Sequence, residues 1–136
     1  MTPGDLVSQE SRAWMEKAAV DLRSARALLD AGIPSSALFH CQQAAEKSFK
    51  AFLTWHKVPF RRVLDLEETG RLCVSIDPTL GAIAKRAEAL TAYAWKLRYP
   101  GDPYDPEMSE AEEGLEIARL ALDEIGRRLP EAARVP

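Results

Sequence analysis

The stretch Ala37-Leu-Phe-His-Cys-Gln-Gln-Ala-Ala-Glu-Lys-Ser-Phe-Lys-Ala-Phe-Leu53 decides the fold class of this 136-residue chain. Its apolar residues recur every three or four positions, which is the period of an α-helix and not the period of two that marks a β-strand. One face of the helix would carry Leu38, Cys41, Ala45, Phe49 and Phe52. We expect this helix to run from about Ser35 to His56, because the proline of Val58-Pro59 disfavours a helical residue before it.

The same spacing predicts helices on both sides of this stretch. Upstream, a helix is expected from an N-cap at about Ser8 to Ala31, and Gly32 would end it. Its apolar stripe would consist of Trp14, Ala18, Leu22, Ala25 and Leu29. Downstream, a short helix is expected within Asp65 to Val74, although Gly70 lowers its helix propensity.

Two further helices complete the prediction. Asp77-Pro78 is typical of a cap followed by proline at the first helical position, and the helix that it opens would stop at Tyr99-Pro100-Gly101. A loop from Pro100 to Pro106 follows. Ser109, with Glu112 three residues later, predicts a capping box for the last helix, which would reach Leu129.

These elements predict an all-α protein, an up-and-down bundle of four main helices plus one short helix. Residues 1–136 would form a single domain with a core at about 8–129, and the ends, roughly 1–7 and 130–136, would be loose. The N-terminus has neither a basic start nor an apolar run, and no stretch approaches the roughly 20 apolar residues of a membrane span. Cys41 and Cys73 lack ligand spacing and are interpreted as buried small apolar residues. A cytoplasmic protein is therefore expected.

Charge is unevenly distributed along the chain. The net charge is −3 at pH 7, so no global basic field is present to hold nucleic acid. Residues 1–63 have a net charge of +3 and residues 64–136 a net charge of −6, and seven acidic residues lie between Asp102 and Glu116. The acidic segment is either a solvated helix face or a surface for electrostatic docking to a basic partner or a second copy.

The helix of residues 35–56 also carries candidate binding residues. At about 100° per residue, Gln43, Glu46, Lys47 and Lys50 would share one polar face opposite the core. Two ammonium groups, a carboxylate and an amide suit a phosphate or an acidic group of a partner. The alternative is structural, because Glu46 and Lys50 have the favourable i,i+4 orientation of a plain surface pair.

A second candidate is the segment that contains Arg98, Tyr99 and Pro100. An arginine and a tyrosine at a helix end beside a rigid loop form a recognition point, but the arginine would equally cap the last helical carbonyl groups. His40 and His56 would lie roughly 24 Å apart along one helix, so they cannot share a metal within one chain. The sequence contains no self-sufficient catalytic motif, and neither a metal nor a cofactor is expected.

The two candidate segments together resemble the HEPN domain family. Ala37 to Leu53, with its Gln-Gln-Ala-Ala-Glu-Lys run, resembles the family's signature helix, and Thr91-Ala-Tyr-Ala-Trp-Lys-Leu-Arg-Tyr-Pro100 resembles a later helix that ends in Arg-Tyr-Pro. The resemblance spans about residues 8–129. It implies a four-to-five-helix bundle, usually a homodimer, often paired with a small nucleotidyltransferase in a toxin–antitoxin-like system.

Many members of that family are metal-independent ribonucleases, in which an arginine is followed after four to six residues by a histidine. Arg98 matches the arginine, but Pro103, Tyr104 and Asp105 occupy the positions where histidine is expected. Leu64 occupies the place of a further histidine that often follows the second helix. None of these side chains acts as a neutral base near pH 7 as imidazole does.

The leading hypothesis is therefore a homodimeric binding module. It would bind a nucleotide, nucleic acid or a partner nucleotidyltransferase near Arg98, Tyr99, Lys47 and Lys50, with Glu46 and Gln43 beside them. The alternatives are a weak or degenerate metal-independent ribonuclease that uses Arg98 with Asp105 or Tyr104, and a structural dimerisation module.

Overall fold

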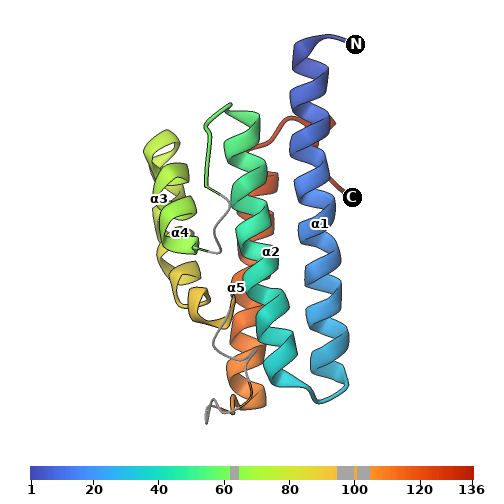
Figure 1. The fold of residues 1–136 in the computed structure, drawn as a ribbon, viewed down its shortest axis with the longest axis vertical. Coiled ribbons are helices and arrows are strands. Elements are labelled where there is room, and N and C mark those ends of the chain that lie inside the picture. The colour runs from blue at the N-terminus through green and yellow to red at the C-terminus, as the bar shows by residue number, and fades with distance from the viewer. Residues whose placement is uncertain (62–64, 95–99, 101–104) are drawn as a thin grey trace.

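The computed structural model describes residues 1–61, 65–94, 100 and 105–136 (Figure 1). These residues form five α-helices and three short 3-10 turns, and they contain no β-strand. The helices are α1 (Pro3–Asp30), α2 (Pro34–Trp55), α3 (Leu66–Ile76), α4 (Gly81–Glu88) and α5 (Met108–Gly126). The predicted all-α bundle is confirmed.

Helix α2 is the central element of the bundle. It packs against α1, α3 and α5, and Figure 1 shows α1 along one side of it and the α3–α4 pair on the other. Its large apolar side chains Leu38, Phe49, Phe52 and Leu53 are fully buried. Because helices surround it, α2 buries far more than the single stripe that the sequence predicted.

The N-terminal helix begins earlier than expected. Thr2 caps it, since its hydroxyl oxygen accepts a hydrogen bond from the Asp5 backbone N–H at 3.2 Å, and its own N–H donates to Asp5 Oδ2 at 3.0 Å. Pro3 occupies the first helical position. This capping box makes Ser8 an interior residue, so the predicted N-cap at Ser8 is wrong and residues 3–7 are helical.

The expected single helix of residues 77–99 is interrupted. Asp77 accepts the Thr79 N–H at 3.0 Å and opens a 3-10 turn at Pro78–Leu80, before α4 begins. After Glu88 the α-helical hydrogen bonding ends, because the Leu90 N–H donates to the Ala87 carbonyl only three residues back. A 3-10 turn then covers Thr91–Ala94. Residues 95–99 lie outside the described residues.

Helix α3 reaches Ile76, and its glycine has a packing role. A Cβ at Gly70 would stand 3.3 Å from Ala84 Cβ, so the glycine permits the close approach of α3 to α4. The same feature recurs where α5 meets α2, because a Cβ at Gly114 would stand 2.6 Å from Leu38 Cδ2. The first glycine thus brings α3 close to α4, and the second brings α5 close to α2.

The C-terminal part also differs in detail from the prediction. Helix α5 begins at Met108 after Glu107, which makes no side-chain capping bond, so the capping box predicted at Ser109 and Glu112 is wrong. Beyond α5 the chain forms a turn at Glu131–Ala133, and the side chain of Ala133 is buried. No helix in the described part of the chain is long and apolar enough to cross a membrane.

Candidate functional site

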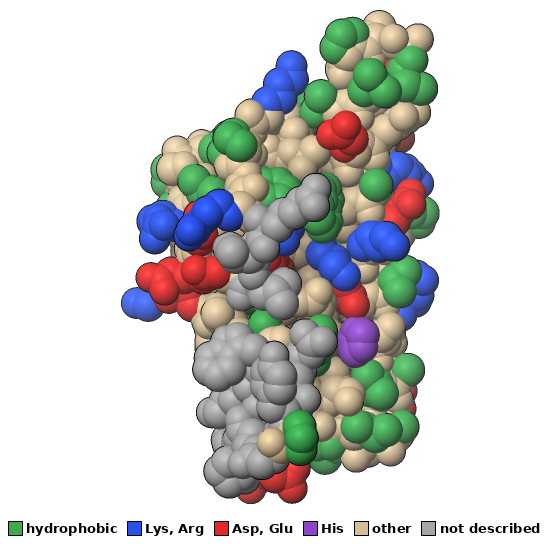
Figure 2. Space-filling view, viewed as in Figure 1, with side chains coloured by type: hydrophobic (Ala, Val, Ile, Leu, Met, Phe, Trp, Pro, Cys, Tyr) green, Lys and Arg blue, Asp and Glu red, His purple; other side chains and the backbone are tan. Residues whose placement is uncertain are grey.

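Polar side chains of α1 and α2 meet along the line where the two helices pack. We call this line the α1–α2 seam, formed by Asp21 of α1 with His40, Gln42, Gln43, Glu46, Lys47 and Lys50 of α2. Figure 2 shows histidine, basic and acidic side chains close together on this side of the molecule. The seam divides into a buried group and a partly exposed group.

The buried group is a hydrogen-bonded row along α2. Lys50 Nζ lies 3.1 Å from Glu46 Oε1, Gln42 Nε2 donates to Glu46 Oε2 at 2.8 Å, and Gln43 Nε2 donates to Gln42 Oε1 at 2.6 Å. Glu46 is only 1% exposed and Lys50 only 8%. The Glu46–Lys50 pair therefore exists as the spacing predicted, but it is buried and not on the surface.

Two aromatic rings enclose the ammonium group of Lys50. Its Nζ lies 5.4 Å from the ring centroid of Trp14 on α1 and 5.6 Å from that of Phe60, in the segment after α2. The rings contact each other edge to face, with centroids 5.9 Å apart. Glu46 Oε1 receives no well-aligned hydrogen bond, so the ion pair and the two ring faces together compensate for the dehydration of Lys50.

The partly exposed group, which we call the outer cluster, is Asp21, His40 and Lys47. Asp21 is buried and contacts both neighbours: Oδ1 lies 2.8 Å from His40 Nδ1, and Oδ2 accepts from Lys47 Nζ at 2.5 Å. The His40 side chain is 35% exposed and that of Lys47 is 25% exposed. Asp21 thus holds the imidazole and the ammonium group side by side at a partly exposed position.

The sequence-predicted residues separate between these two groups. Lys47 belongs to the outer cluster, whereas Lys50, Glu46 and Gln43 belong to the buried row, so they do not form one solvent-facing surface. Arg98 and Tyr99 lie outside the described residues. Of the alternative ribonuclease residues, Asp105 is exposed, and Tyr104 lies outside the described residues.

Sequence reasoning missed Asp21 as a member of the seam, and it missed Trp14 and Phe60 as the aromatic neighbours of Lys50. Asp21 did leave a signal, because it falls between Ala18 and Ala25, which both lie in the buried stripe of α1. An acidic residue on the edge of such a stripe requires a polar partner on a neighbouring helix. Phe60 left no signal, since it lies beyond the helix.

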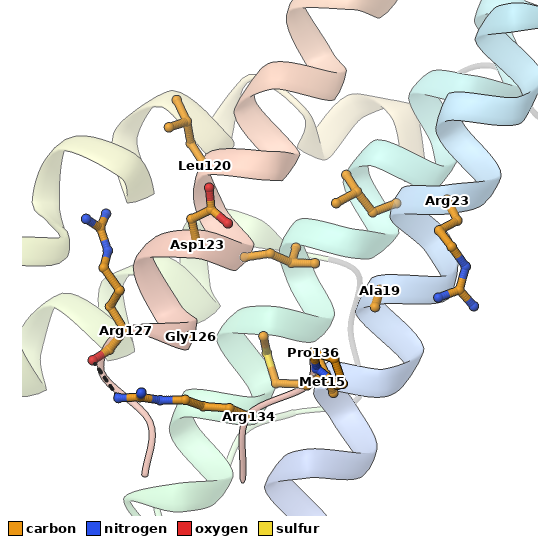
Figure 3. Close-up of a pocket in the computed structure, with 12 residues that line it drawn as sticks. Met15, Ala19, Arg23, Leu120, Asp123, Gly126, Arg127, Arg134 and Pro136 are labelled. Atoms are coloured by element: carbon orange, nitrogen blue, oxygen red, sulfur yellow. Dashed lines mark hydrogen bonds between the residues drawn. The ribbon is translucent and has the colours of Figure 1, made fainter. Parts of the chain in front are cut away.

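A wider hollow lies between α1, α5 and the C-terminal segment (Figure 3), with a volume of about 870 Å³. Its polar groups are largely committed to the fold: Arg134 donates to the carbonyl groups of Leu129 at 2.8 Å and of Arg127 at 3.4 Å. Arg12 donates to the Arg134 carbonyl at 2.7 Å. These bonds anchor the C-terminal segment, and we assign the hollow no chemistry despite its size.

Neither thiol nor metal chemistry is supported by the described side chains. Burial raises the pKa of the Cys41 thiol to about 12, and it also raises the pKa of Cys73, so both are protonated near pH 7. Among residues 1–61, 65–94, 100 and 105–136, no three His, Cys, Asp or Glu side chains come together as metal ligands would.

Comparison with known proteins identifies one family. The family model of the HEPN domain matches residues 11–128 of the chain. No curated protein and no solved structure matches it. The matched residues include every member of the α1–α2 seam, together with Trp14 and Phe60.

Proposed function

The chain belongs to the HEPN domain family, and from this premise we propose that it is a cytoplasmic, homodimeric binding module for a nucleotide, free or within RNA. HEPN domains are helical modules that are often related to nucleotides or RNA. The outer cluster would receive a phosphate group, and Arg98 and Tyr99 would complete the site. In this proposal the buried Lys50 and Glu46 and the half-buried Gln43 support the seam.

The observation that carries this proposal is the arrangement around Asp21. Lys47 and His40 are partly exposed and are both held by one buried carboxylate, so their hydrogen-bond donors are positioned before a ligand arrives. The lysine charge is paired with that carboxylate. Such a cluster suits a ligand with a few phosphates, because binding a long polyanion depends on many uncompensated cations.

The ribonuclease alternative lacks a base in the expected place. The sequence after Arg98 contains no histidine, and Asp105 is an exposed carboxylate. An imidazole would have to come from His40, whose Nδ1 already contacts Asp21, or from His56 at the C-terminal end of α2. Binding without efficient cleavage therefore fits the available groups better.

A protein partner is the second candidate function, and the acidic start of α5 favours it. Glu112, Glu113 and Glu116 are exposed there. A nucleotidyltransferase with a basic surface would be attracted to this helix, as in a toxin–antitoxin-like pair. If neither a ligand nor a partner protein bound, a structural dimerisation module would be the remaining hypothesis for the function.

Titration calorimetry tests the proposal with ATP, a short single-stranded RNA and the product of the neighbouring gene. We expect Arg98→Lys to weaken nucleotide binding about tenfold with little change in Tm, because lysine lacks the planar fork of guanidinium. Lys47→Ala should weaken binding more mildly and reduce its salt dependence. The RNA should be recovered intact.

Lys85→Ala is the matched control, since Lys85 is an exposed lysine on α4, away from the seam. Its affinity should equal that of the wild type. Equal binding by wild type, Arg98→Lys and Lys47→Ala would contradict the proposed site. RNA cleavage that disappears in Arg98→Ala would establish the ribonuclease instead.

A further inference from the structure

A second hollow lies on α1, next to the seam. Its volume is about 350 Å³, and Glu10, Ala13, Trp14 and Lys17 line it. This volume falls within the range of roughly 300–1,000 Å³ that is usual for small-molecule sites. All four residues belong to one helix, so the hollow is shaped by side chains and not by a gap between helices.

Trp14 offers this hollow a fixed aromatic surface. The indole is only partly buried, and it is held by the edge-to-face contact with Phe60 and by the ammonium group of Lys50. Lys50 is in turn held by Glu46. An aromatic ring that is already immobilised loses little conformational freedom when a planar group stacks on it.

The hollow and the outer cluster lie along the same edge of α1. Glu10, Trp14, Lys17 and Asp21 follow one another at spacings of four, three and four residues, which places them on one helix face. Trp14 and Asp21 are about 10 Å apart along the helix axis. Lys17 lies between them, is exposed and has no ion-pair partner within the described part of the chain.

We propose that the hollow is a nucleobase site, in which a base stacks on the Trp14 indole and Lys17 meets the adjoining sugar–phosphate. The ligand would then extend along α1 toward Lys47 and His40. This inference rests on the proposed function for its phosphate contacts and adds the base subsite to it. Because every base has a π-face, stacking here would discriminate little between the bases.

The test compares ligands that differ only in the base. Calorimetry on the full chain would use ATP, inorganic triphosphate and adenosine, with wild type, Trp14→Leu, Trp14→Phe and Lys17→Gln. We expect ATP to bind about tenfold or more tightly than triphosphate. Trp14→Leu should abolish this advantage of ATP while leaving triphosphate binding unchanged. Trp14→Phe should keep part of the advantage. Lys17→Gln should weaken ATP binding.

Tryptophan fluorescence supplies an independent readout and a matched control. AMP should quench the emission of the wild type and of Trp55→Phe, since Trp55 lies at the end of α2 outside the hollow, but not that of Trp14→Phe. The conservative Trp14→Phe change keeps this arm informative if Trp14→Leu fails to fold. Equal affinity for ATP and triphosphate, or quenching that survives in Trp14→Phe, would overturn the inference.

The ligand series distinguishes a failure of the phosphate site from a failure of the nucleobase site. If triphosphate binds and the base adds nothing, the phosphate site stands and the nucleobase site is wrong. If triphosphate does not bind but adenosine binds in a manner that depends on Trp14, the nucleobase site stands and the proposed phosphate contacts are wrong. If no ligand binds, both are wrong.

Discussion

Lys50 shows how one residue links the stability of the bundle to its candidate site. Its ammonium group is almost fully removed from water and is compensated by Glu46, Trp14 and Phe60. Dehydrating an ion costs several kcal/mol, and the cost is recovered only while the partners stay in place. The same contacts fix the Trp14 ring that faces the hollow.

We predict that Lys50→Met destabilises the protein by about 3–5 kcal/mol, because it leaves the Glu46 carboxylate buried without a cation. Adding Glu46→Gln should recover most of this loss, since a neutral amide can still accept from Gln42. Urea denaturation of the single and double variants measures the coupling. The exposed Glu116–Arg119 pair is the control, and Arg119→Met there should change stability little. Additive effects in the double variant would contradict a coupled buried pair.

The pairing of Glu46 with Lys50 could be predicted from the sequence, but its burial could not. Spacing and orientation identify an i,i+4 pair equally well on an exposed helix and on a buried one. Whether the pair meets water depends on how many helices surround α2, and that is a property of the assembled bundle. The role of Asp21 could have been suspected from its place beside Ala18 and Ala25, but its two partners on α2 could not have been named.

At the scale of the element, local capping chemistry decided where the helices begin. Thr2, Pro3 and Asp5 form a complete start signal, but apolar periodicity does not mark it, because the apolar stripe of α1 begins later in the sequence. The interruption of the predicted helix of residues 77–99 has a different origin. Its apolar residues Leu80, Ile83, Ala87 and Leu90 are all buried as their spacing suggests, but 3-10 turns flank α4.

Gly114 tests how closely α5 must approach α2. Alanine is a better helix former than glycine by about 1 kcal/mol, but its Cβ would stand 2.6 Å from Leu38 Cδ2. Leu38 is fully buried, so shifting its Cδ2 would press it against other core side chains, and overpacking should dominate. We predict a net loss of about 1–2 kcal/mol for Gly114→Ala in thermal or urea unfolding.

Gly126→Ala, at the end of the same helix, is the matched control. A Cβ there meets nothing within 4 Å, so the helix propensity of alanine should act alone and leave stability unchanged or slightly raised. If the two variants behaved alike, the contact between α5 and α2 would not be tight at Gly114.

At the scale of the whole molecule, the charge asymmetry of the chain bears on assembly. Residues 1–63, which include α1 and α2, have a net charge of +3, and residues 64–136 have a net charge of −6. Two copies can therefore attract each other if the acidic start of α5 of one copy approaches the basic half of the other. In a twofold dimer that contact occurs twice, because the acidic surface of each copy meets the basic surface of the other.

We accordingly predict a dimer that weakens as salt is added. Light scattering at micromolar concentration should give twice the 15.1 kDa chain mass at low ionic strength. The dissociation constant should rise with salt, because the Debye length falls from about 30 Å at 0.01 M to about 3 Å at 1 M. The charge reversal Glu112→Lys with Glu113→Lys should weaken the dimer while circular dichroism shows that each copy stays folded, since both side chains are exposed. Lys85→Glu, a reversal on α4, is the control for a general effect of charge.

A monomer at low salt would show that the predicted dimer does not form. A dimer that neither salt nor the α5 reversal affects would have to be held by apolar contacts instead.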